Sequence, residues 1–166
     1  SAIAPLPLGV RQETAVAALD GKVYVAGGFV MNGGIVARVE VFDPADGGWS
    51  AVASLPKAMH HANMAAVGGK LYVVGGLEGL GFTALGDVYE YTPGAAAWVT
   101  KTAMPVAQRR GGSGVAVTGG KIYLVGGFRA GAAVTDFTSY DPVADAHATL
   151  PALATVRDHL VAGAAG

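Results

Sequence analysis

A segment of about 49 residues recurs three times in this chain, and this period constrains the fold more than any other feature. A lysine, an apolar run that contains a tyrosine, and a glycine pair occupy residues 22–28, 70–76 and 121–127. An aromatic residue two positions before a proline recurs in the same phase, at Phe42, Tyr91 and Tyr140. Similar units at a fixed period indicate a repeat architecture, in which each unit buries its apolar faces against its neighbours.

Each unit predicts four short strands, named a to d in chain order. Strand a covers residues 13–19, 62–67 and 112–117, and each copy ends in an Asp-Gly or Gly-Gly pair that suits a tight hairpin turn. Strand b is the apolar run into the glycine pair, strand c covers 37–42, 86–91 and 134–140, and strand d begins near Trp49, Trp98 and His147. Strands a and b are apolar at nearly every residue, so protein is expected to cover both of their faces. Stacked β-propeller blades provide that cover, whereas a β-sandwich would not need near-identical units.

The repeated motif resembles the kelch repeat. The resemblance rests on the double glycine after an apolar strand, the tyrosine within that strand, and a tryptophan 21–22 residues after the glycines. It extends over essentially the whole chain, although His147 occupies a tryptophan position and Thr92 stands where the other copies have Asp43 and Asp141. The fold class that it implies is all-β, with four-stranded antiparallel blades of a kelch-type propeller. The motif is specific to the fold and nearly silent on function.

The phase of the repeat predicts one partial propeller domain over residues 1–166, with an incomplete ring of about three blades. The blades cover 11–56, 60–105 and 109–151, between an orphan strand d over 1–8 and an orphan strand a over 157–166. Propellers typically close with about four to eight blades, so this ring needs further blades or another copy of the chain. We favour a portion of a longer ring over two copies that form a ring together. An engineered or excised fragment that self-assembles is a third interpretation.

Composition excludes several classes of partner. A net charge of −1 provides no field that would attract nucleic acid or an anionic membrane, and no apolar run approaches the ~18 residues of a membrane helix. We therefore expect neither nucleic acid nor a membrane as partner. The absence of cysteine excludes disulfides and thiolate metal sites. Abundant alanine and glycine suggest a bacterial, exported or periplasmic protein, but composition does not fix the compartment.

The candidate site is the face where the d–a and b–c loops meet, because these loops are the longer and more variable ones and binding residues concentrate in such loops. Arginine recurs at the start of strand a, and its guanidinium group can bind a carboxylate through two hydrogen bonds. By resemblance to kelch-like domains that bind acidic peptides or anionic sugars, Arg11, Arg109 or Arg110, and Arg157 lie where such contacts occur. The full candidate set is Arg11, Gln12, Glu13, Phe29, His60, His61, Asn63, Leu77, Arg109, Arg110, Phe128, Arg129, Arg157 and His159. In a competing interpretation, these residues cap the mouth of the central channel of the propeller and donate hydrogen bonds to carbonyl groups at the blade edges.

The predicted function is an interaction module that binds a peptide, protein or glycan through this face. The alternative is a carbohydrate-active enzyme that resembles sialic-acid mutarotases, with acid/base groups such as Glu13, Arg11 or His60. We predict no catalytic set, no cofactor and no metal. Neighbouring histidines on a strand point to opposite faces, so a metal site that uses both His60 and His61 is not expected, although one of them could join His159 or Glu13 at the channel mouth. Copper oxidases of this broad class use a Tyr–Cys link, which this chain cannot form.

Overall fold

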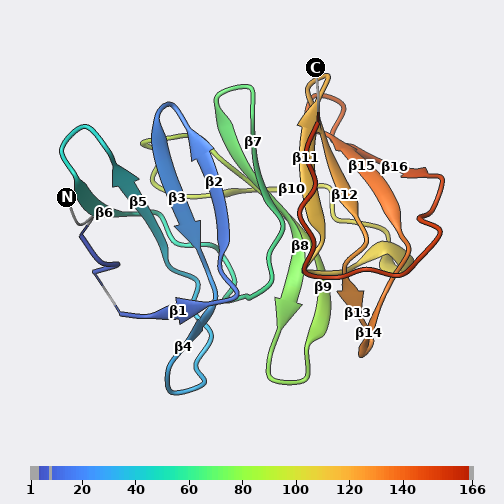
Figure 1. Ribbon diagram of the computed structural model, residues 1–166. Coiled ribbons are helices and arrows are strands. Elements are labelled where there is room, and N and C mark those ends of the chain that lie inside the picture. The colour runs from blue at the N-terminus through green and yellow to red at the C-terminus, as the bar shows by residue number, and fades with distance from the viewer. Residues whose placement is uncertain (1–3, 8, 165–166) are drawn as a thin grey trace.

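Three four-stranded antiparallel sheets stack as propeller blades in the computed structural model, which describes residues 4–7 and 9–164 (Figure 1). This part of the chain contains no α-helix and one 3-10 turn, η1 (Val106–Gln108), so it has no helix long and apolar enough to cross a bilayer. The predicted all-β fold with an open ring of three blades is confirmed.

The strands of each blade pair in chain order, from the innermost to the outermost. The first blade contains β2 (Ala15–Leu19), β3 (Lys22–Ala26), β5 (Val39–Asp43) and β6 (Gly48–Val52). The second contains β7 (Met64–Val67), β8 (Lys70–Glu78), β9 (Thr83–Tyr91) and β10 (Val99–Lys101). The third contains β11 (Gly114–Thr118), β12 (Lys121–Val125), β15 (Phe137–Asp141) and β16 (Ala146–Leu150). Two short pairs lie outside the blades: β1 (Arg11–Gln12) with β4 (Phe29–Val30), and β13 (Phe128–Arg129) with β14 (Ala132–Ala133).

The hydrophobic core lies between the blades rather than within a single sheet. Tyr24 and Val41 of the first blade pack with Met64 and Tyr89 of the second. On the other face of the second blade, Tyr72, Val74 and Val88 pack with Ile122 and Tyr140 of the third. Burying an aliphatic or aromatic side chain of this size contributes roughly 1.5–3 kcal/mol, so the packing of neighbouring blades stabilises each of them.

One hydrogen bond repeats at the outer strand of every blade. The indole Nε1 of Trp49 donates to the Ala4 carbonyl at 2.8 Å, and that of Trp98 donates to Ala53 at 2.8 Å. His147, the exception in the tryptophan series, places its Nε2 at 2.9 Å from the Thr102 carbonyl. All three bonds span 45 residues, so the imidazole takes over the anchoring role of the indole.

The two flanking segments differ from the strands expected at 1–8 and 157–166. Residues 4–7 and 158–164 form no strand, and Arg157 makes one isolated bridge to Val134. A strand needs a hydrogen-bonded neighbour, and neither segment has the rest of a blade beside it. Residues 160–162 nevertheless pack against Gly114 of the inner strand β11. Residues 1–3, 8, 165 and 166 lie outside the described part of the chain, and strand formation in a closed ring stays a prediction.

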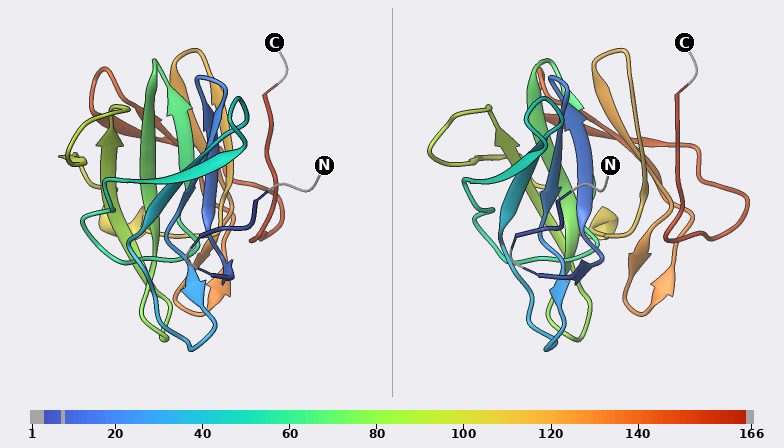
Figure 2. Two further views of the ribbon diagram at one scale, coloured as in Figure 1. Left: turned by 90° about the vertical axis from the view of Figure 1, so that its left-hand side faces the viewer. Right: turned by 60° about the vertical axis from the view of Figure 1, so that its left-hand side comes forward.

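The two kinds of loop lie at opposite ends of the blades. The tight hairpins β2–β3, β7–β8 and β11–β12 point to one end, whereas β4, the β8–β9 hairpin and β13–β14 project from the other (Figures 1 and 2). The segments that enter β2, β7 and β11 lie at this second end too (Figure 1). We call it the loop face, and it carries the candidate residues.

Candidate functional site

A chain of backbone hydrogen bonds crosses the blades at the start of the innermost strands. The His61 amide donates to the Glu13 carbonyl at 3.0 Å, Gly112 donates to His61 at 2.8 Å, and His159 donates to Gly112 at 2.9 Å. All four residues adopt a left-handed backbone conformation, with φ of 54°, 50°, 61° and 50° for Glu13, His61, Gly112 and His159. Few non-glycine residues adopt this region, so the contacts between blades must hold them there. We call this feature the mouth chain.

His60 and His61 lie ring to ring beside the mouth chain. Their Nδ1 atoms are 2.5 Å apart, and the Nε2 of His60 is 3.1 Å from the Gly79 carbonyl. The prediction that the two side chains point to opposite faces is wrong, because His61 is left-handed and the alternation of an extended strand does not apply. Burial lowers the pKa of His60, and it lowers the pKa of His61 to about 4, so both rings are neutral at pH 7.

Glu13 and His159 complete a cluster with His61. One Glu13 carboxylate oxygen, Oε2, lies 3.2 Å from the Nε2 of His61 and 3.6 Å from the Nε2 of His159. The Nδ1 of His159 donates to Asp158 at 3.0 Å. The His61 side chain is 4% exposed, whereas those of Glu13 and His159 are 38% and 50% exposed. The mouth chain thus brings together three side chains from segments that are 48 and 98 residues apart.

Two of the candidate arginines are buried and fully engaged. Arg110 is inaccessible to solvent and donates to the carbonyls of Gln108, Leu124 and Gly126 and to the Thr138 hydroxyl. Burial lowers its pKa to about 10, so it keeps its charge at pH 7.

Arg11 forms a buried ion pair with Glu40, in which each side chain is 1% exposed, and it also donates to the Arg38 carbonyl. The expectation that Arg11 and Arg110 present free guanidinium groups to a ligand is therefore wrong. Their bonds to carbonyl groups match the competing interpretation of residues that serve the blade edges.

Asn63 and Leu77 also have structural roles. Asn63 is 2% exposed, and its amide donates to the carbonyls of Val74 and Arg110 and accepts from the Ser113 backbone. This side chain thereby ties the second blade to the third. Leu77 is fully buried.

The remaining arginines do not converge on one site. Arg129 pairs with Asp136, and Arg157 is exposed. Arg109 lines a separate cavity of ≈ 300 Å³, in which Lys57 lies 3.7 Å from Glu78 and 3.6 Å from Asp87. The structure therefore separates the arginines that the sequence grouped together.

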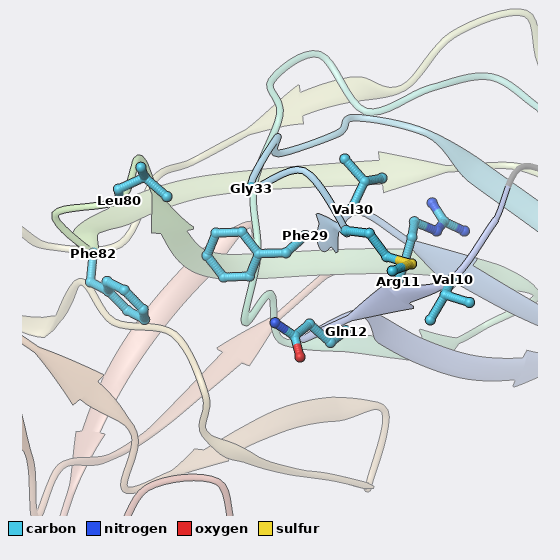
Figure 3. A pocket seen from close by; sticks show the side chains of 9 residues that line it. Val10, Arg11, Gln12, Phe29, Val30, Gly33, Leu80 and Phe82 are labelled. Atoms are coloured by element: carbon cyan, nitrogen blue, oxygen red, sulfur yellow. The ribbon is translucent and has the colours of Figure 1, made fainter.

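A cavity of ≈ 550 Å³ opens on the loop face between the β1–β4 pair and the β8–β9 hairpin (Figure 3). The Phe29 ring forms one wall, with its centroid 4.1 Å from that of His60 and 6.1 Å from that of Phe82 (Figure 3). Phe82 in turn lies 6.0 Å from Phe128. The lining residues are Val10, Arg11, Gln12, Phe29, Val30, Met31, Gly33, Leu80 and Phe82. Arg11, Gln12 and Phe29 were predicted from the sequence and the other lining residues were not, although apolar residues beside glycines at 30–34 and 79–82 were the available signal.

A family model identifies the family, and two curated relatives carry the same repeat name. The KLHDC2/KLHL20/DRC7 kelch-repeats domain model matches residues 4–157. The chain belongs to the kelch-repeat family. Kelch-like protein terF of Aspergillus terreus is 32% identical over 163 residues, which cover 90% of this chain and 36% of that protein. Human Kelch-like protein 35 is 36% identical over 131 residues, covering 79% of this chain and 21% of that protein.

Two further similarities concern the fold and a shorter segment. A solved structure of YjhT superposes on 95% of this kelch chain and 56% of its own, with a TM-score of 0.81 and 20% identity, which shows a shared fold. The N-acetylneuraminate epimerase of Pasteurella multocida is 36% identical over 83 residues, or 48% of this chain and 22% of the epimerase. The chain thus spans about a third or less of the curated relatives named here.

Proposed function

We propose that this kelch domain is a non-catalytic binding module, whose loop face accepts an apolar anchor from a peptide or another protein. The observation that carries this proposal is the ≈ 550 Å³ cavity. Three side chains on its lining, Val10, Met31 and Leu80, are 71%, 88% and 73% exposed. Large apolar side chains left in solvent around a concave site are typical of surfaces that another protein covers.

The lining chemistry favours an apolar ligand group over an anionic one. Phe29 and Phe82 offer aromatic walls, and Gln12 offers an amide at the edge (Figure 3). Arg11 is the one charged residue among the lining residues that the structure describes, and Glu40 already neutralises it. An inserted apolar or aromatic side chain would gain about 1.5–3 kcal/mol from burial, whereas a carboxylate would find no unpaired cation among the described residues of the lining. Kelch-repeat propellers commonly bind proteins, which supports the same choice.

Charge placed on the cavity rim tests this proposal. A peptide panel and a glycan array identify the ligand, and titration calorimetry then measures its affinity for variants. We expect Met31→Glu and Leu80→Glu each to weaken peptide binding by about tenfold or more, since burying an unpaired carboxylate costs more than about 1.4 kcal/mol. Val143→Glu is the matched control, because Val143 is 96% exposed and follows β15 at the opposite end of the third blade. Unchanged affinity in both rim variants, or binding confined to glycans, would refute the proposal.

The epimerase similarity supports a second candidate, an enzyme that acts on N-acetylneuraminate or a related sugar. Of the three acid/base candidates, Glu13 is the accessible one, because His60 is buried and Arg11 is paired with Glu40. Nuclear magnetic resonance exchange spectroscopy measures the interconversion of N-acetylneuraminate anomers directly. Acceleration by the chain that Glu13→Gln abolishes would establish this activity, and a rate equal to that in buffer would exclude it.

A further inference from the structure

We propose that Glu13, His61 and His159 form a binding site for one divalent transition-metal ion of the Zn²⁺ type at the mouth of the central channel. Two histidine nitrogens and one carboxylate are a ligand set that Zn²⁺ uses when a fourth position stays open. The proposal is independent of the apolar cavity, because none of these three residues lines that cavity.

The hydrogen bonds of His60 fix which His61 nitrogen carries the lone pair. The Gly79 carbonyl can only accept, so the His60 Nε2 must donate to it and the His60 Nδ1 carries no proton. The Nδ1 of His61 faces that bare nitrogen and therefore carries the proton of the pair. The lone pair of His61 is left on Nε2, the atom that lies 3.2 Å from Glu13 Oε2.

His159 is oriented in the same way by a different partner. Its Nδ1 donates to the Asp158 carboxylate at 3.0 Å, which leaves the lone pair on Nε2. That atom is 3.6 Å from the same Glu13 oxygen. Histidines that bind metals almost always donate their other nitrogen to a carboxylate or a carbonyl, and this site uses a carboxylate for His159 and a histidine–carbonyl relay for His61.

Three atoms that carry lone pairs thus face one another without a hydrogen atom between them. One ligand atom from each of Glu13, His61 and His159 lies within 4.8 Å of the other two. With metal–ligand bonds of about 2.0–2.2 Å, a tetrahedral ion holds its donor atoms ~3.4 Å apart, close to the distances from Glu13 to the two histidines. The half-exposed His159 side chain can move toward His61 and bring the two histidine nitrogens to a similar separation.

The surroundings of His61 exclude water from one side of the cluster. The rings of Phe29 and Phe82 lie 6.4 and 5.5 Å from its centroid and replace water on that side. A low-dielectric wall strengthens the attraction between the Glu13 carboxylate and a bound cation. The ion would also connect segments that precede the first two blades and follow the third.

Titration calorimetry with Zn²⁺ alone, on chain stripped of metal by a chelator, tests the site. We expect one Zn²⁺ to bind per chain. Asp158→Asn removes only the hydrogen bond that orients His159 and should lower the Zn²⁺ affinity roughly 10–100-fold. Glu13→Gln and His159→Gln remove ligands, so each should lower the affinity by more than that. His147→Gln is the control and should leave the affinity unchanged, because His147 lies in the outer strand β16. The visible spectrum of bound Co²⁺ should report tetrahedral coordination in the wild type and lose that signature in the two ligand variants.

Glu13 and His159 are partly exposed, so both variants should fold, and circular dichroism checks this. If the wild type binds Zn²⁺ no more tightly than Glu13→Gln or His159→Gln, a shared proton between His61 and Glu13 explains the geometry and the proposal is overturned. A loss of equal size in His147→Gln would overturn it as well. Neither result depends on any peptide or sugar ligand, so failure here is distinct from failure of the proposed binding module.

Discussion

Replacing Arg110 by methionine should destabilise the domain by about 3–6 kcal/mol. The guanidinium group makes four hydrogen bonds of 2.7–3.0 Å. The Gly126 carbonyl keeps a second donor, Ser113 Oγ at 3.0 Å, and the Gln108 carbonyl can turn to water. The Leu124 carbonyl and the Thr138 hydroxyl lose a buried charged donor, at roughly 1.5–3 kcal/mol each. Methionine fills much of the volume, so the cavity contribution is small.

Urea unfolding followed by circular dichroism measures this loss by linear extrapolation. Since a domain of this kind is stable by only about 5–15 kcal/mol, the shift in midpoint is large. Arg110→Lys keeps the charge without the planar fork and should lose about half as much. Arg157→Ala removes an exposed side chain and should change stability by less than ~0.5 kcal/mol. A loss below about 1 kcal/mol for Arg110→Met would refute the structural role of the guanidinium group.

Two further perturbations follow from the backbone and from one carboxylate. Gly27→Ala should cost roughly 2 kcal/mol more than Gly47→Ala in the same urea assay. Both glycines have positive φ (64° and 71°), but only the Cβ added at Gly27 would meet a backbone atom, the Met59 carbonyl oxygen. Equal losses would contradict the close approach of the first and second blades. The Tyr140 hydroxyl and the Thr102 amide donate to Asp145 and lower the pKa of that carboxyl, so its contribution to stability is present above the unfolded pKa of ~3.9 and is lost as the pH falls through the native value. The advantage of the wild type over Asp145→Asn should therefore shrink on acidification, and a constant difference between pH 7 and pH 3 would contradict this link.

The fold was predictable because its signal is repeated. Lys22, Lys70 and Lys121 start the second strand of each blade as expected, and Trp49, Trp98 and His147 all fall in the outermost strand or at its start. Strand c of the second blade is longer than expected, since β9 begins at Thr83 instead of 86. The β8–β9 pairing runs past the glycine pair through a bulge between Val74 and Gly76, an extension that the other two copies lack.

The candidate site was less predictable because the residues that contact its side chains change from one repeat to the next. The arginines at 11 and 110 belong to one recurring position, but the groups that engage them, Glu40 and Thr138, differ between blades. The contact between His60 and His61 requires a left-handed histidine, which a strand pattern does not reveal. Phe82 reaches His60 because of the extended hairpin. Tertiary contacts thus determine where these side chains lie, whereas the local sequence pattern determines the strands.

The mouth chain also gives the blades a direction. Each later segment donates its amide to the carbonyl of the earlier one, from His61 to Glu13, Gly112 to His61 and His159 to Gly112. A donor end cannot pair with another donor end, so this series can be extended only head to tail. Any added blade, from a longer chain or from a second copy, has to enter in the same rotational sense around the channel. Two copies placed back to back at equivalent blades would leave the mouth chain interrupted, whereas a rotation about the channel axis would continue it.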